Sequence, residues 1–434
     1  MGIRFTTVRL SDRRSTVYQL FVLVVVLAFS GCNQTRESEP TKNEVFRVVL
    51  DTPGGELPFQ LELNFSDPQN VVGWVVNYPE RIEVPAVTWD SEHKALELRF
   101  DYYDSTIEFE NFDREQMSAG KWRKRVAGDD EWQEMTARIT PVADYFENIE
   151  PATKPSKRKI SGRYQVKFSS EPELAVAIFD QEDNGVVTGT FLTTTGDYRY
   201  LAGLVVDDSM TLSCFDGAHA LLFRAKNDVA GRWVGDFWSG KTFHDRWVAE
   251  KNEVVRLSDP LGLTKWRGHV KLTDLKFKGL DGQERSLGDA EFAGKGVVLQ
   301  LFGSWCPNCH DAAELMTEIY QTRKSDGLSV VGLAFELTDD FDRNKTQVER
   351  YVDRHGTTYP VLIVGPSDKR LATAAFGALD RVHSFPTTIF IKGDGTVHAI
   401  YTGFSGPATG DDYVRLKKTY ERLINEILEL ESSE

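Results

Sequence analysis

Two cysteines three positions apart, Cys306 and Cys309, carry the clearest chemistry in this sequence. They stand in the segment Trp305–Cys309 (WCPNC), shortly after the apolar run Val297–Phe302. We expect the apolar run to be a buried strand and Cys306 to begin a helix, with Pro307 in the first turn, where no N–H donor is needed. Unpaired N–H groups and the helix dipole stabilise a thiolate at that end. Such a thiolate can attack a disulfide, and the second cysteine can then release the product.

Half of a zinc site is the alternative interpretation of this pair. Zinc would need two further ligands, and the remaining cysteines, Cys32 and Cys214, lie far away in the sequence. His310 is adjacent but cannot easily join both sulfurs in one tetrahedron. We therefore favour a redox pair and expect no metal and no cofactor. Cys214 is expected to be a small buried hydrophobic residue.

The motif Val297–Cys309 (VVLQLFGSWCPNC), together with Phe385–Thr388 (FPTT), resembles the thioredoxin superfamily, and more narrowly its TlpA/ResA-like exported thiol–disulfide oxidoreductase branch. The resemblance covers about residues 265–434. It implies that Cys306 is the exposed nucleophile and Cys309 the buried resolving thiol. It also implies that Pro386 is a cis-proline facing the disulfide, which is feasible because X-Pro bonds adopt cis at low cost. Trp305 is counted with this catalytic motif.

Glu336 matches an acidic position that members of this branch place near the cysteine pair. A partly buried carboxylate there could tune a thiol pKa or relay a proton, whereas the alternative is a solvated glutamate at a strand end. For Pro386 the alternative is an ordinary edge-strand proline. Gln300 and Asn308 depart from the family pattern, in which Asp and Pro are common, and they leave the redox potential open.

The elements that would position these residues form a mixed α/β sandwich. Apolar runs and turn residues predict a central mixed sheet with helices on both faces over residues 262–434. The predicted strands are 275–277, 297–302, 328–335, 359–364, 387–392 and 396–401, and the predicted helices are 306–324, 345–355 and 413–430.

The preceding region is mainly β, because short alternating runs are separated by turns such as Asn184-Gly185 and Asp216-Gly217. Residues 45–150 and 160–257 are predicted to be two related β-rich modules, joined by a linker at 151–159. The segment 95–110 resembles 210–225, and 119–122 resembles 230–233, at offsets of about 111 to 115 residues. Chance similarity between strand-rich segments is the alternative. No chemically active cluster is predicted in residues 45–250.

The N-terminal residues have the features of an export signal. Basic residues precede the apolar stretch Leu20–Phe29, which is shorter than a membrane span of about 20 residues. Ser30-Gly31-Cys32 resembles a bacterial lipobox, which implies a signal peptide at 1–31 and lipidation of Cys32. An incidental Cys32 after a cleaved signal or an uncleaved anchor is the alternative. Residues 32–44 are polar and are predicted to be a flexible tether.

These features predict a lipid-anchored enzyme on the periplasmic or extracytoplasmic face of a membrane, which reduces disulfides of exported proteins. Such an enzyme would take its electrons from a membrane thiol-electron transporter. A disulfide oxidase or isomerase, a thiol peroxidase, or a binding protein whose β modules recognise a ligand are the alternatives. The peroxidase is disfavoured because the Pro-x-x-x-Thr-x-x-Cys pattern is absent. The net charge of −15 argues against nucleic-acid binding.

Overall fold

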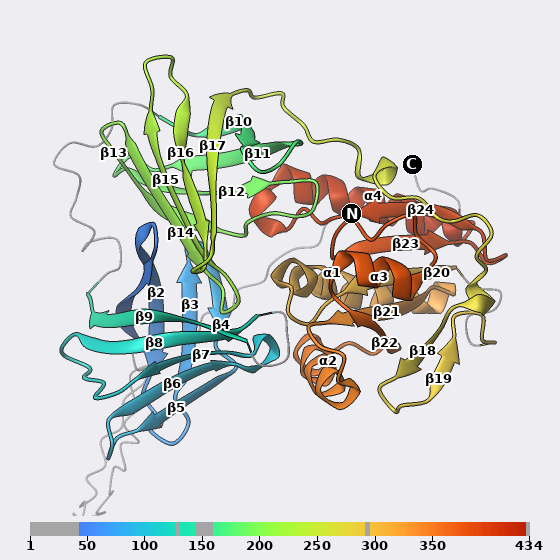
Figure 1. Cartoon of the computed structure of the whole chain (residues 1–434), viewed down its shortest axis with the longest axis horizontal. Coiled ribbons are helices and arrows are strands. Elements are labelled where there is room, and N and C mark those ends of the chain that lie inside the picture. Colours follow the sequence, from blue (N-terminus) through green and yellow to red (C-terminus); the bar gives the residue numbers. More distant parts are fainter. Residues whose placement is uncertain (1–42, 127–130, 144–158, 291–295, 431–434) are drawn as a thin grey trace, which may run out of the picture. The chain divides into compact units, whose positions relative to one another are not determined.

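Three β-sheets form the scaffold of the part of the chain that the structure describes (Figure 1). The computed structural model describes residues 43–126, 131–143, 159–290 and 296–430. The predicted signal peptide, Cys32, and most of the tether and of the linker 151–159 lie outside these residues. Among the helices in the described ranges, none has the length and apolar character needed to cross a membrane.

The first sheet has nine antiparallel strands in the order β4-β3-β2-β1-β9-β8-β7-β6-β5. Side chains along its strands alternate between buried and exposed, as in β2, where Leu57, Phe59, Leu61 and Leu63 all point into the core. Its strands are β1 (Glu44–Thr52), β2 (Gly55–Asn64), β3 (Val72–Asn77), β4 (Glu80–Glu83), β5 (Ala86–Asp90), β6 (Ala95–Phe100), β7 (Ser105–Phe109), β8 (Ser118–Arg125) and β9 (Trp132–Pro141), with a short 3₁₀ helix, η1 (Asp101–Tyr103).

The second sheet is a closed barrel in which every strand pairs with its neighbours in the sequence and the last pairs with the first. Closure leaves no free sheet edge. Its interior is apolar and includes Cys214, which is fully buried, as expected. Its strands are β10 (Gly162–Phe168), β11 (Leu174–Gln181), β12 (Val186–Leu192), β13 (Leu201–Val206), β14 (Ser209–Phe215), β15 (Ala220–Asn227), β16 (Trp233–Ser239) and β17 (Phe243–Lys251).

The two β modules share a meander topology in which the first and last strands pair. The hairpins β6–β7 and β14–β15 also share a register, because Leu96 pairs with Phe109 and Thr211 pairs with Arg224 at the same offset. The second part of the predicted repeat agrees only in part, because Trp122 and Trp233 lie in the corresponding strands β8 and β16 but the residues before them differ in structure. Residues 119–122 lie within β8, whereas 230–232 form a turn before β16. The duplication of the β module therefore stays a prediction, which the shared register of the hairpins β6–β7 and β14–β15 supports.

The C-terminal part has the expected thioredoxin-like architecture, with a mixed sheet in the order β19-β18-β22-β21-β20-β23-β24. Strands β20, β21 and β22 are parallel, and β23 runs antiparallel to β20. The elements are η2 (Pro260–Gly262), η3 (Leu272–Asp274), β18 (Lys276–Gly279), β19 (Glu284–Ser286), β20 (Val297–Phe302), α1 (Pro307–Arg323), η4 (Lys324–Asp326), β21 (Ser329–Glu336), α2 (Phe341–His355), β22 (Val361–Pro366), α3 (Lys369–Phe376), β23 (Thr387–Ile391), β24 (Val397–Thr402), η5 (Pro407–Thr409) and α4 (Asp411–Ile427).

Every residue of β20, β21 and β23 is buried, so both faces of the sheet are covered. Figure 1 shows helices on either side of this sheet. The predicted strands and helices all exist, with ends displaced by a few residues. Helix α3 was not predicted, because its eight residues are too few for a helical periodicity of apolar side chains to be recognised.

Residues 42–434 form one compact unit, so contacts between the β modules and the thioredoxin-like part lie inside that unit. The core of the thioredoxin-like part nevertheless draws all its members from residues 261–428. The strands of the three sheets lie within the predicted domain ranges, apart from Glu44. The domain boundaries themselves stay predictions.

Candidate active site

Cys306 and Cys309 lie where β20 turns into α1. The buried strand ends at Phe302, and Cys306 occupies the position just before the first helical residue, Pro307. The Cys306 N–H donates to the Gly303 carbonyl (3.1 Å), and the Cys309 N–H donates to the Cys306 carbonyl (2.9 Å). Both cysteines are free thiols. The predicted placement of this pair at a helix N-terminus is therefore observed.

The two thiols differ less in exposure than we expected. Cys309 is fully buried, but Cys306 is also only 7% exposed, which contradicts the expectation of an openly exposed nucleophile. Burial raises the pKa of the Cys309 thiol well above its usual value, and its hydrogen bond with Cys306 and the charge of Glu336 act in the same direction. Cys309 therefore stays a thiol at neutral pH.

Pro386 follows a cis peptide bond from Phe385 and faces the redox motif. The Cys306 thiol donates to the Phe385 carbonyl, with the sulfur 3.7 Å from the oxygen. The strand that begins after Pro386, β23, pairs on one side with β20 and on the other with β24. Pro386 therefore directly precedes an interior strand, and the edge-strand alternative is wrong.

Trp305 packs beside this contact. Its indole N–H donates to the Phe335 carbonyl (2.9 Å), and its ring meets the Phe385 ring edge-on at 6.0 Å between centroids. The side chain thus ties the turn before Cys306 to the end of β21 and to the segment before Pro386.

Glu336 is the last residue of β21 and is only 1% exposed, so the solvated alternative is wrong. Both carboxylate oxygens accept hydrogen bonds from Ser304, two residues before Cys306. The backbone N–H of Ser304 donates to one oxygen (2.9 Å) and its hydroxyl to the other (2.6 Å). Burial raises the pKa of Glu336 to about 7, although the bonds from Ser304 favour the carboxylate. Glu336 therefore titrates near neutral pH.

Ser304 is also held from its other side by His310, which the sequence analysis did not assign to the site. The His310 Nε2–H donates to the Ser304 carbonyl (2.8 Å), because a carbonyl can only accept. The other ring nitrogen, Nδ1, must then accept from His355 Nε2 (2.7 Å). Burial lowers the pKa of His310 well below its usual value, so the ring is neutral. Adjacency to Cys309 was the only feature in the sequence that could have indicated this role.

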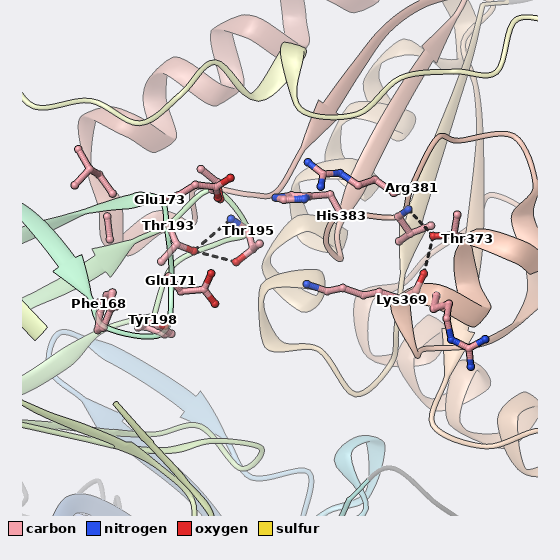
Figure 2. A pocket seen from close by; sticks show the side chains of 15 residues that line it. Phe168, Glu171, Glu173, Thr193, Thr195, Tyr198, Lys369, Thr373, Arg381 and His383 are labelled. Carbon is pink, nitrogen blue, oxygen red and sulfur yellow. Dashed lines mark hydrogen bonds between the residues drawn. The ribbon is translucent and has the colours of Figure 1, made fainter. Parts of the chain in front are cut away.

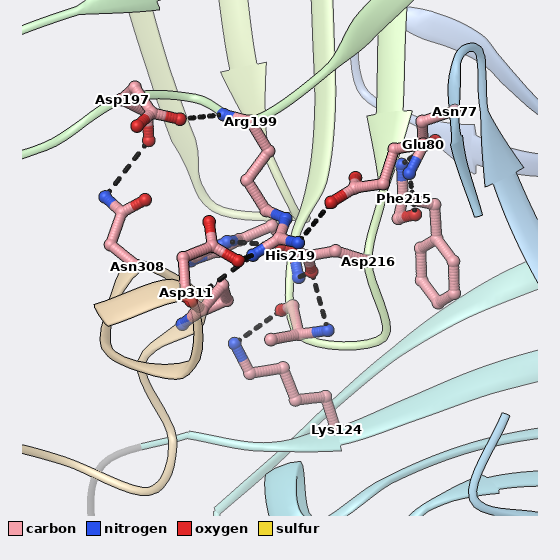
Figure 3. Close-up of polar contacts among 12 residues, drawn as sticks. Asn77, Glu80, Lys124, Asp197, Arg199, Phe215, Asp216, His219, Asn308 and Asp311 are labelled. Atoms are coloured by element: carbon pink, nitrogen blue, oxygen red, sulfur yellow. Dashed lines mark hydrogen bonds and ion pairs between the residues drawn. The ribbon is translucent and has the colours of Figure 1, made fainter. Parts of the chain in front are cut away.

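Arg199, from the loop between β12 and β13, joins the β modules to the redox helix (Figure 3). Its guanidinium donates to the Pro307 carbonyl (3.2 Å) and to the Asp311 carboxylate (2.9 Å), and it also pairs with Glu80 of the first module. Asp216 lies 4.0 Å away. The sequence did not indicate this ion-pair cluster, because its members are scattered along the chain.

The loop that carries Arg199 lies against the residues between the two cysteines. Asn308 donates through its side-chain amide to the Asp197 carbonyl (3.1 Å), and the Gly406 N–H donates to the Asp197 carboxylate (2.5 Å). A Cβ at Gly196 would come within 2.1 Å of the Asn308 amide nitrogen, so a larger residue at that position would displace the Asn308 side chain. The barrel therefore supplies part of the surface around the redox motif.

Gln300 and two histidines of the barrel lie apart from the two cysteines. Gln300 is buried in the middle of β20, where its side chain accepts from the Tyr359 hydroxyl (3.4 Å). His219 and His244 each pair with an aspartate of the barrel. Within the described ranges, no three His, Cys, Asp or Glu side chains come together in a way that could hold a metal ion.

The comparisons with known proteins concern this C-terminal part. The AhpC/TSA family model matches residues 269–400, which contain both cysteines, Glu336 and Pro386. The thiol-disulfide oxidoreductase ResA of Geobacillus kaustophilus is 33% identical over 132 residues, which are 30% of this chain and 64% of that protein. ResA of Halalkalibacterium halodurans is 29% identical over 180 residues, covering 41% of this chain and 86% of that protein.

A solved structure of a thiol:disulfide interchange protein of the thioredoxin family from Chlorobium tepidum is 22% identical. The match covers 37% of this chain and 99% of the chain in that structure, with a TM-score of 0.27. The chain spans 64% and 66% of the length of two ResA relatives, from G. kaustophilus and G. thermodenitrificans. The similarity to ResA confirms the sequence-based resemblance for the thioredoxin-like part.

Proposed function

We propose that this protein is a thiol–disulfide oxidoreductase that reduces disulfides through the pair Cys306 and Cys309. The observation that carries the proposal is the placement of two free thiols at the N-terminus of α1, with the first in contact with the carbonyl that precedes cis-Pro386. The similarity to proteins named ResA supports the same chemistry.

The reaction consists of two exchange steps. Cys306, as a thiolate, attacks one sulfur of the substrate disulfide, which forms a mixed disulfide and releases the first substrate thiolate. Cys309 then loses its proton and attacks the Cys306 sulfur, which releases the second substrate thiolate and leaves a Cys306–Cys309 disulfide. The substrate gains two electrons and two protons, and the enzyme pair loses them. Glu336 is the group proposed to tune Cys309 or accept its proton, because it is buried and titrates near neutral pH.

Cys306 is the attacking residue in this proposal because Cys309 is fully buried and burial raises the pKa of its thiol. Since Cys306 itself is nearly covered, attack on a protein disulfide requires the surface around it to open. A peroxidase is not favoured, because nothing in the motif supplies the proline and threonine that such enzymes place before the reactive cysteine.

The setting of the reaction is the cell envelope, on the periplasmic or extracytoplasmic face of a membrane. The apolar stretch before Ser30-Gly31-Cys32 supports export and lipidation of Cys32. Exported proteins with disulfides are the proposed substrates, and a membrane thiol-electron transporter is the proposed donor. Mass spectrometry of the mature protein tests the anchor: we expect a chain that begins at a lipidated Cys32, and an unmodified Cys32 or another cleavage site contradicts it.

Reduction of insulin by the full chain with dithiothreitol tests the activity. We expect acceleration by the natural protein, none by Cys306→Ser, and unchanged acceleration by Cys214→Ser, whose cysteine lies inside the barrel. A natural protein that gives no acceleration would favour the binding-protein alternative. Activity retained in Cys306→Ser would show that another group carries the chemistry.

A further inference from the structure

A pocket of about 560 Å³ lies between the barrel and the thioredoxin-like part, inside the compact unit of residues 42–434 (Figure 2). Its barrel side comes from the end of β10, the start of β11 and the loop after β12. Its other side comes from α3 and from the segment that leads to cis-Pro386. No step of the reaction described above uses this pocket.

The two walls of the pocket carry opposite charges. Glu171 stands on the barrel side, and Lys369 and Arg381 stand on the thioredoxin-like side, as Figure 2 shows. Across the part of the chain that the structure describes, these three side chains form no ion pair, in contrast to the many arginines that do. Glu173, beside Glu171, already accepts a hydrogen bond from Thr194 (2.8 Å). The cationic wall is thus free to bind a negatively charged group.

His383 adds an unused polar atom to the same wall. Its Nε2 is buried and has no hydrogen-bond partner among the described residues. Burial and the nearby Arg381 lower the pKa of His383, so the ring is neutral and Nε2 can pair with a peptide group. A buried polar atom without a partner is unfavourable, and a bound ligand would satisfy it.

The floor of the pocket is apolar and aromatic. Phe168 and Tyr198 meet edge-on at 6.1 Å between ring centroids, and Leu174 and Val382 lie beside them. An apolar or aromatic side chain that enters the pocket would lose its contact with water there. A pocket with an apolar floor and a few polar groups at its walls is typical of a binding site.

The pocket adjoins the redox motif on two sides. His383 is two residues before Phe385, a span of at most about 7 Å, and the Phe385 carbonyl contacts Cys306. On the barrel side, Thr193 and Thr195 belong to the loop that reaches Asn308 through Asp197. An extended chain of a few residues can therefore span from the pocket to Cys306.

We propose that this pocket binds the segment of a protein substrate that flanks its reacting cysteine, with an apolar side chain on the Phe168–Tyr198 floor and a carboxylate on Lys369 and Arg381. The proposal rests on the oxidoreductase function proposed above and names the substrate class: polypeptide disulfides with an acidic residue next to an apolar one near the cysteine. The barrel then contributes directly to substrate choice.

Two peptide disulfides test this recognition. Each contains a phenylalanine three residues before the oxidised cysteine, followed by aspartate in one peptide and by lysine in the other. The natural full-length protein should reduce the aspartate peptide with a kcat/KM about tenfold higher, since attraction and repulsion at two exposed cations each contribute modestly. The preference should shrink at high salt concentration.

Charge reversal provides the decisive comparison. Lys369→Glu combined with Arg381→Glu should reverse the preference toward the lysine peptide. The matched control, Lys276→Glu with Lys418→Glu, changes two exposed lysines outside the pocket and should keep the original preference. Equal rates for both peptides, or a preference that survives the reversal of Lys369 and Arg381, would overturn the pocket proposal. Failure of the natural protein to reduce either peptide would instead overturn the proposed function.

Discussion

Replacing Glu336 by glutamine isolates the effect of one buried carboxyl on the stability of the redox site. The carboxyl is 1% exposed and bonded only to Ser304 among the described residues. In glutamine, one side-chain oxygen can still accept from the Ser304 N–H, and the Ser304 hydroxyl can turn to accept from the new amide. The substitution therefore removes the charge while the packing is kept.

The magnitude follows from the pKa of Glu336, which burial raises from 4.5 to about 7. Between these two values the folded protein retains a proton that the unfolded chain has lost, so its free energy of unfolding falls as the pH rises. Once the pH is well above 7, the folded protein has also lost this proton, and the free energy of unfolding no longer falls through Glu336. For the cited pKa values, the natural protein should lose about 2.5 kcal/mol between pH 5 and pH 8 through this residue. Glu336→Gln should not show this loss.

Urea unfolding of the natural protein and of Glu336→Gln at several pH values measures the effect. The difference between their free energies of unfolding removes the contribution of the other titrating groups, which both proteins share. Glu284→Gln, at an exposed strand residue, is the matched control and should show no such trend. The same variant should move the alkylation profile of Cys309 to lower pH, since the charge of Glu336 raises the pKa of that thiol. A stability difference that stays constant from pH 5 to pH 8 would refute the burial argument for Glu336.

Three further predictions concern the roles of the two cysteines, the Arg199 cluster and the C-terminal domain. Cys309→Ser should accumulate mixed disulfides with substrates on non-reducing gels, whereas Cys306→Ser should accumulate almost none; the reverse pattern would assign the attack to Cys309. Arg199→Gln should lower the free energy of unfolding by about 3 kcal/mol, because it leaves the partly buried Asp311 and Glu80 without the buried cation that they share. Arg246→Gln, at an exposed barrel residue, should change the free energy of unfolding little. Equal effects of the two substitutions would show that the Arg199 cluster does not stabilise the fold. A fragment from Pro260 to Glu434 should fold and keep disulfide reduction, since its core is self-contained; an insoluble fragment would place the boundary elsewhere.

The features that the sequence predicts well are local. The uninterrupted apolar run Val297–Phe302 is visible in the sequence because a strand buried on both faces needs apolar side chains at almost every position. The redox pair and Pro386 are found through short motifs whose chemistry needs few residues. The helix α1 follows from the same motif, because the strand must end before Cys306 for a helix to begin there.

The features that the sequence does not reveal depend on contacts between distant segments. Arg199 meets Asp311 and Glu80 only because the barrel, the first sheet and α1 come together, and no local pattern distinguishes it from other arginines. The coverage of Cys306 has the same origin, since a motif places a side chain on an element but does not show what packs over it. Closure of the barrel likewise depends on the pairing of β10 with β17, about 80 residues later in the chain.

The reduction potential of the Cys306–Cys309 pair tests the central claim most directly. The full-length protein would be equilibrated in buffers of defined thiol–disulfide potential, and the fraction of oxidised pair would be measured by alkylation and mass spectrometry. We expect a two-electron transition near the value of thioredoxin, about −270 mV, which would make the protein a reductant. A transition near about −120 mV would make it an oxidant, and the absence of any transition between the two cysteines would contradict the proposed redox cycle.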